Sequence, residues 1–108
     1  MRVNFTARHY KPSERLKDYA ISEVQKLDKF YEGIINCDII LDYQKLYQIA
    51  EIIIHVHGQQ MTAVEKSEDI YKSIDLAVAK LERQLKKHKG KTHQFNNERI
   101  KDNIEVAM

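Results

Sequence analysis

Hydrophobic residues in this chain follow two different spacings, and the order of those spacings restricts the possible folds. Alternation of apolar and polar residues predicts a strand, whereas an apolar residue at every third or fourth position predicts a helix. The alternating segments, which we expect to be strands, lie at residues 2–8, 37–43, 49–57 and 60–66. Helical spacing covers about 14–31 and then runs from Ser67 to a predicted stop at Gly90. The predicted order of elements is therefore β-α-β-β-β-α.

Two amphipathic helices and four strands bury their apolar faces most simply as two layers. We therefore expect an α+β fold, a two-layer sandwich with both helices on one face of a four-stranded, largely antiparallel sheet. A chain of 108 residues suits one such domain, which we place at residues 1–91. Residues 92–108 are polar and weakly periodic, so they are predicted to form a flexible C-terminal tail.

Basic residues are concentrated near the end of the second predicted helix. Six of them and one acid, Glu82, lie between Lys80 and Lys91, so this segment carries +5 in a chain whose formal net charge is +2. The remainder consequently carries −3. Such a polarised distribution favours an anionic partner, although a short basic run is also typical of an ordinary solvated helix face.

The basic residues of both helices are predicted to lie away from the buried stripes. At 100° per residue, Arg83, Lys86 and Lys87 fall on the side of the second helix opposite its apolar residues. Lys26 and Lys29 cluster in the same way on the first helix. Phosphate chains suit such a surface, because each neutralised phosphate releases counterions. Most aromatic residues are predicted to lie on core faces, so structured RNA read by shape is favoured over stacked single strands.

Other constellations give little support for catalysis. His55 and His57 share one strand face with Glu51, yet outward histidines on a strand are ordinary and a metal site is the less favoured interpretation. The single cysteine, Cys37, is expected to be a buried, inert thiol. We expect no enzyme activity, no cofactor, no metal and no small-molecule substrate. With no apolar run that predicts a signal peptide or a membrane helix, we expect a cytoplasmic protein without a membrane partner.

Two segments of the second helix carry a resemblance to a known family. Residues 67–75 read SEDIYKSID and residues 80–89 read KLERQLKKHK. They resemble the signature of the ribosome hibernation-promoting factor and ribosome-associated inhibitor family, also described as sigma-54 modulation proteins. The TARH at residues 6–9 and the LKDY at 16–19 are similar to that family too. The likeness covers about residues 2–91 in matching order.

The resemblance implies a translation regulator for stationary-phase stress. Such a protein binds ribosomal RNA of the small subunit, in the channel for messenger and transfer RNA, and inhibits translation by idle ribosomes. It implies a fold similar to double-stranded-RNA-binding domains and a protein that is monomeric off the ribosome. Carried over by position, the RNA-binding residues are Lys80, Arg83, Lys86, Lys87, Lys89, Lys26 and Lys29, with Arg8 and His9 as weaker candidates. Asp69, Tyr71 and Asp75 are expected to act structurally, in capping and in packing of the helix on the sheet.

Two questions stay open at this point: the effect on ribosome dimerisation and the class of function. The long form of the family adds a C-terminal dimerisation domain, for which the 17 residues after Lys91 leave no room. Those residues resemble the tail of the inhibitor subtype, so promotion and opposition of ribosome dimerisation are both possible. A generic structured-RNA-binding module and a protein-interaction regulator of transcription are the alternative functions.

Overall fold

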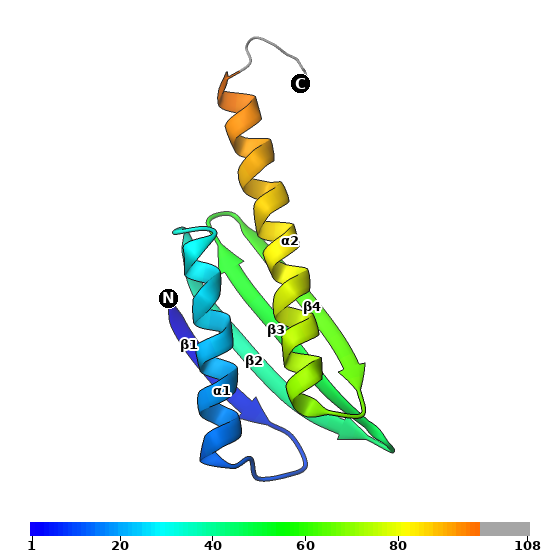
Figure 1. The fold of residues 1–108 in the computed structure, drawn as a ribbon. Helices are drawn as coiled ribbons and strands as arrows, with labels where there is room; N and C mark the ends of the chain where they lie inside the picture. Colours follow the sequence, from blue (N-terminus) through cyan, green and yellow to red (C-terminus); the bar gives the residue numbers. More distant parts are fainter. Residues whose placement is uncertain (98–108) are drawn as a thin grey trace.

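The computed structural model describes the backbone of residues 1–97 and the side chains of residues 1–88. Its elements are β1 (Arg2–Ala7), α1 (Glu14–Gln25), the 3-10 helix η1 (Lys26–Lys29), β2 (Ile34–Gln44), β3 (Tyr47–Val56), β4 (Gln59–Ser67) and α2 (Ile70–Asn97). The predicted order β-α-β-β-β-α is confirmed, and so is the α+β class, with α1 and α2 on one face of a four-stranded sheet (Figure 1).

The sheet is mixed and its strands lie in the order β1-β2-β3-β4. β1 pairs with β2 in parallel, because α1 carries the chain back to the starting end of the sheet before β2 begins. The other two pairs, β2 with β3 and β3 with β4, are antiparallel hairpins. The expectation of a largely antiparallel sheet is therefore confirmed for the two hairpin pairs, while the first pair is parallel.

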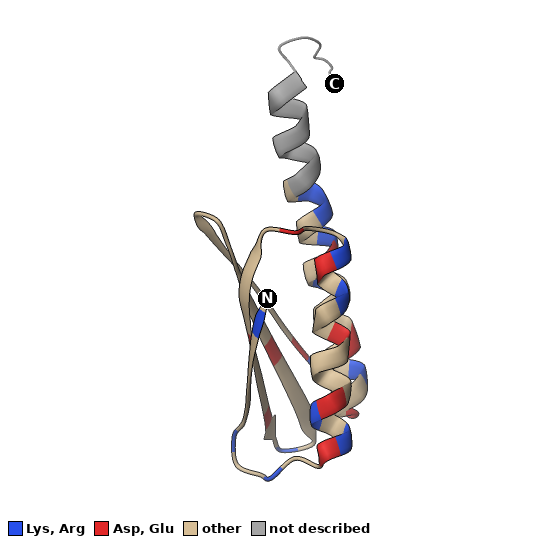
Figure 2. Ribbon diagram, turned by 90° about the vertical axis from the view of Figure 1, so that its left-hand side faces the viewer, with Lys and Arg blue, Asp and Glu red and all other residues tan. Residues whose placement is uncertain are grey.

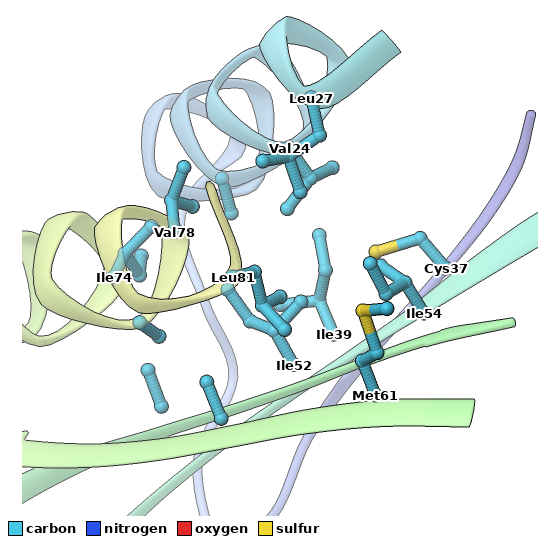
Figure 3. Close-up of a cluster of buried hydrophobic side chains, with 14 of the residues drawn as sticks. Val24, Leu27, Cys37, Ile39, Ile52, Ile54, Met61, Ile74, Val78 and Leu81 are labelled. Carbon is cyan, nitrogen blue, oxygen red and sulfur yellow. The ribbon is translucent and has the colours of Figure 1, made fainter. Parts of the chain in front are cut away.

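The core lies between the sheet and the two helices. Figure 3 shows Ile39, Ile52 and Ile54 reaching from the strands toward the helix side chains. Their helix partners in this cluster are Val24, Leu27, Ile74, Val78 and Leu81. Cys37 is fully buried, and this burial raises the pKa of its thiol to about 12. The thiol therefore stays protonated near neutral pH, which agrees with the predicted inert cysteine.

The first helix begins as predicted and ends earlier. Ser13 is its N-cap, with the Ser13 hydroxyl accepting a hydrogen bond from the backbone N–H of Leu16 at 3.1 Å. Regular α-helix ends at Gln25, and the next turn tightens into η1, where the N–H of Phe30 donates to the carbonyl of Leu27 at 3.0 Å. The predicted limit near residue 31 was wrong for the α-helix, because a tightened last turn keeps the same apolar spacing.

The second helix continues past its predicted end. It runs to Asn97, so the prediction that Gly90 stops it was wrong. A glycine inside a helix costs only about 1 kcal/mol relative to alanine, and the lysines and glutamines around Gly90 are good helix formers. The predicted tail at 92–108 therefore begins inside a helix, and residues 98–108 lie outside the described part of the chain. No helix within the described residues is long and apolar enough to cross a membrane.

Polar and aromatic residues at the start of α2 fix the two helices to each other. The Asp69 carboxylate accepts a hydrogen bond from the N–H of Tyr71 at 3.0 Å, which caps the helix. The Tyr19 hydroxyl of α1 donates to Asp75 of α2 at 2.5 Å, and the Tyr19 and Tyr71 rings meet edge to face at 4.9 Å. The structural role expected for Asp69, Tyr71 and Asp75 is therefore present. Asp69 also bonds to the end of the sheet, where the Ser67 hydroxyl of β4 donates to its carbonyl at 2.7 Å.

Candidate nucleic-acid interface

Most of the predicted RNA-binding residues lie in the half of the helical layer that includes η1, which is the upper half in Figure 1. Lys26 and Lys29 come from η1 and line a groove between η1 and α2. Lys86 of α2 reaches across toward η1, where its ammonium lies 5.0 Å from the centre of the Phe30 ring. Lys86 therefore lies beside the segment that carries Lys26 and Lys29.

The other basic residues of α2 lie on its outward side and on the side facing β4. Lys80 reaches Glu65 of β4 at 3.7 Å, and Lys87 lines a shallow hollow with Gln59 and Met61 of the same strand. Arg83 and Lys87 are exposed and, among the side chains that the structure describes, they form no ion pair. We name the whole group, which is Lys26, Lys29, Lys80, Arg83, Lys86 and Lys87, the basic helix surface.

Acidic residues interrupt the basic helix surface at three places. Glu23 accepts from Lys26 at 2.7 Å, Glu82 lies 3.2 Å from Lys86, and Glu65 pairs with Lys80. The hydrogen bond to Glu23 raises the pKa of Lys26, so this lysine stays charged. Exposed pairs of this kind contribute roughly 0–1 kcal/mol, so a phosphate can replace the acid at little cost. Arg83 and Lys87 need no such exchange, which makes them the strongest candidates for phosphate contacts.

Charge is distributed unevenly between the two layers of the fold. Lys, Arg, Asp and Glu mark α1 and α2 densely, while most of the sheet carries other residues (Figure 2). The acids Glu68, Asp69 and Asp75 stand just before α2 or in its first turns, and Arg83, Lys86 and Lys87 follow about two to five turns later. The attraction for an anion is therefore strongest at the upper half of the helical layer.

Arg8 and His9 lie at the opposite end of the molecule, just after β1. His9 has a left-handed backbone (φ 70), and its Nδ1 is 2.8 Å from the carboxylate of Asp42. This hydrogen bond, helped by one from the N–H of Tyr43, lowers the pKa of Asp42. Arg8 and His9 consequently do not join the basic helix surface. The side chain of Lys89, the remaining predicted contact, lies outside the described residues.

Sequence reasoning missed a group of exposed aromatic residues near His9. Period-two alternation placed Tyr43 on the core face of its strand, yet its side chain is 43% exposed. The tip of the β2–β3 hairpin projects past the start of α2 and lies well to the side of α1, so neither helix covers it (Figure 1). The missing signal was the length of the strands relative to the helices, which alternation does not give.

The paired histidines do not form a metal site. The His55 ring lies 3.4 Å from Asp38 on the neighbouring strand, and Asp38 also accepts from the Asn4 amide at 2.8 Å. No group of three potential metal ligands exists among the residues that the structure describes. His55 is thus accounted for by sheet packing, and the predicted absence of a metal or cofactor in the chain as a whole stays a prediction.

Comparisons with known proteins agree on one family. The family model described as "Sigma 54 modulation protein / S30EA ribosomal protein" matches residues 3–93. A ribosome hibernation promoting factor of Pseudomonas putida is 34% identical over 91 residues, which is 84% of this chain and 89% of that protein. Its counterpart in Escherichia coli strain K12 is 30% identical over 94 residues, covering 87% of this chain and 99% of the relative.

Solved structures show the same fold. A ribosomal subunit interface protein from Coxiella burnetii superimposes with a TM-score of 0.79 at 29% identity, over 83% of this chain and 99% of that one. The N-terminal domain of Thermus thermophilus Protein Y gives a TM-score of 0.76 at 26% identity, over 82% and 99% of the two chains. The arrangement of two helices on a four-stranded mixed sheet is therefore shared with both. The predicted likeness to double-stranded-RNA-binding domains stays a prediction.

Proposed function

Because the chain belongs to the family of sigma 54 modulation proteins and S30EA ribosomal proteins, we propose that it binds the small ribosomal subunit and keeps idle ribosomes from translating. Relatives that it matches over most of their length are named ribosome hibernation promoting factors, and a similar structure is a ribosomal subunit interface protein. The proposal extends what those names say to this chain and adds the surface that makes the contact.

The observation that carries the proposal is the position of Arg83 and Lys87. Both are exposed on a long, firmly packed helix, and within the described part of the chain neither is neutralised by an acid. The buried residues Leu81 and Leu85 hold the helix on the sheet from the other side. A rigid row of cations at helical spacing suits the regularly spaced phosphates of folded ribosomal RNA, which it would contact without reading sequence.

Inhibition follows if the bound domain occupies the channel for messenger and transfer RNA. Those ligands pair with and lie against the same ribosomal RNA, so a domain seated there excludes them by occupying their volume. No chemical step is required. The protein would act as a reversible block whose effect depends on its concentration relative to that of the competing RNAs.

A pair of matched double variants tests the proposed surface. Arg83→Glu with Lys87→Glu reverses two charges on the basic helix surface, whereas Lys17→Glu with Lys72→Glu makes the same change in net charge on exposed positions nearer the start of each helix. We expect the first variant to lose at least a hundredfold in affinity for purified small subunits at low salt, and the second to lose only a few-fold. Co-sedimentation in sucrose gradients gives the affinity, and circular dichroism gives the folding control.

Salt titration of the same proteins separates specific contacts from general attraction. For the native protein, log affinity should fall linearly with log salt concentration, with a slope that reflects several phosphate contacts. The Arg83/Lys87 variant should show a shallower slope by about two. Equal binding by the two double variants would remove the basic helix surface as the ribosome contact. Equal affinity for free RNA duplexes and for ribosomes would favour the generic RNA-binding alternative.

A further inference from the structure

The tip of the β2–β3 hairpin exposes apolar and aromatic side chains that the fold itself does not use. Leu46 is 79% exposed, Tyr47 is 49% exposed and Tyr43 is 43% exposed. Lys45, in the turn between the strands, has a left-handed backbone with φ 57. Glycine would adopt that conformation at a lower energetic cost than lysine. The exposed apolar and aromatic side chains beside this turn are typical of an interaction site.

Tyr43 is held in place before any ligand arrives. Its ring meets the Tyr10 ring edge to face at 5.8 Å, and the His9 ring at 6.2 Å in the same manner. Tyr10 packs against the core, and His9 is tied to Asp42 by the 2.8 Å hydrogen bond. A ring fixed in this way loses little conformational entropy on binding. Tyr47 is less available, because the ammonium of Lys66 lies 5.4 Å from the centre of its ring.

Two exposed cations lie near Tyr43 at the hairpin tip. Arg8 follows β1 and Lys45 forms the turn. Lys66 of β4 lies instead over the Tyr47 ring, which the pairing of Gln44 with Tyr47 puts on the opposite face of the hairpin from Tyr43. The acid of the tip, Asp42, already accepts hydrogen bonds from His9 and from the N–H of Tyr43. Fixed aromatic rings among basic side chains are the combination that binds single-stranded nucleic acid, since bases stack on the rings while phosphates meet the cations.

We propose that the hairpin tip is a second RNA-binding site, where an unpaired base stacks on Tyr43 and its phosphates contact Arg8 and Lys45. The site differs from the basic helix surface in chemistry and in place. Gln48 of the hairpin pairs with Ser67, at the start of the connection to α2, and Lys86 lies about 25 Å further along that helix, at 1.5 Å per residue. Two RNA segments can therefore bind at once. The inference rests on the proposed function only for the source of the RNA, which would be an unpaired segment of ribosomal RNA.

The test uses the full chain in a variant whose basic helix surface has lost two of its cations. In the Arg83→Glu, Lys87→Glu background, binding of a fluorescein-labelled uridine dodecamer is measured by anisotropy at low salt for three further variants: Tyr43→Ala, Tyr43→Phe and Lys45→Glu. We expect Tyr43→Ala to weaken binding about tenfold, as the loss of one stacked base predicts, and Tyr43→Phe to retain it within twofold. The dependence of log affinity on log salt should be unchanged in Tyr43→Ala and shallower in Lys45→Glu.

Each result decides for or against the site. Parental affinity in Tyr43→Ala, or equal losses in Tyr43→Ala and Tyr43→Phe, would overturn the stacking proposal. If Tyr43→Ala does not fold, Lys45→Glu decides, because its exposed turn position leaves the core intact and unchanged binding would again refute the site. Tip variants that bind the dodecamer normally but lose ribosomes would mean that the tip meets a protein. Since the dodecamer assay contains no ribosome, its failure is independent of any failure of the proposed function.

Discussion

The two halves of the interface between α1 and α2 differ in the contacts that join them. In the half where α2 begins, Tyr19 donates a 2.5 Å hydrogen bond to Asp75 and packs its ring against Tyr71. In the upper half, the groove between the helices is lined by Lys26, Lys29, Glu23 and Glu82, and it reaches Asp75. The polar groups of the first half bond to one another from helix to helix. In the second half, Lys26 pairs with Glu23 and Lys86 with Glu82 three and four residues away in the chain, so these exposed pairs do not join the two helices. Hydrogen bonds between the helices therefore indicate structure, whereas exposed local pairs leave their cations available to a partner.

The largest predicted effect is a loss of stability on truncating a buried residue that holds the upper half of α2 on the sheet. If that half is held by apolar packing and not by its charges, Leu85→Ala should lower the free energy of unfolding by about 2–5 kcal/mol, because Leu85 is fully buried. Arg83→Ala, two residues earlier on the exposed side of α2, should change it by less than about 0.5 kcal/mol. Urea denaturation of both variants gives the numbers. A comparable loss of stability in Arg83→Ala would mean that the exposed upper surface also stabilises the fold.

Cys37 provides a second test, because a buried thiol destabilises the fold once it must ionise. Its pKa is raised to about 12 in the folded protein, so its contribution to stability is complete below the ordinary value of about 9 and is lost as pH rises from 9 to 12. The native protein should lose about 1 kcal/mol more than Cys37→Ala between pH 9 and pH 10. Parallel pH profiles for the two proteins would show that the thiol is accessible to water when folded.

A third prediction concerns the half where α2 begins. Tyr19→Phe removes the hydroxyl that donates to Asp75 and should cost about 1 kcal/mol of stability while keeping the ring contact with Tyr71. Affinity for small subunits should not change, since neither residue belongs to the basic helix surface. A drop in affinity without a drop in stability would reverse the assignment of this half to structure.

The smallest expected effect is a gain of affinity. Glu82→Gln removes the acid that lies 3.2 Å from Lys86, so phosphates no longer need to displace it. We expect affinity for small subunits to rise two- to threefold at low salt, with little change in stability, because exposed pairs contribute little. Glu68→Gln, an exposed position beside the start of α2, is the matched control and should leave affinity unchanged. Weaker binding by Glu82→Gln would show that the pair positions Lys86.

Alternation predicted the strands well because the central strands bury one face against the helices. In β3, Ile52, Ile54 and Val56 are buried, while the alternate residues Glu51, Ile53 and His55 are only partly so. The ends of the helices were harder to predict, because they depend on local geometry. The second helix continues through Gly90, and η1 keeps the apolar spacing of a helix in a tighter turn. The aromatic tip was missed because coverage by a helix depends on how the layers are placed and not on the strand's own pattern.

The basic helix surface was predictable in part. Helical spacing correctly put Arg83 and Lys87 on the side away from Leu81 and Leu85, because one stripe of the helix must be buried. Spacing within a helix does not reveal neighbours from other elements, so the pairing of Lys80 with Glu65 of β4 was not predicted. Arg8 and His9 came from the family resemblance, which gives positions along the chain and not places in the fold, and they lie at the other end of the molecule.

The central claim is that the bound domain and the translation ligands exclude one another, and a competition titration tests it directly. Purified small subunits are loaded with a fluorescent form of this protein, and messenger with initiator transfer RNA is added at increasing concentration. The account predicts complete displacement at saturating ligand, and an apparent affinity for the protein that falls in proportion to ligand concentration. Simultaneous binding with unchanged affinities would contradict the account, even if the protein binds ribosomes tightly.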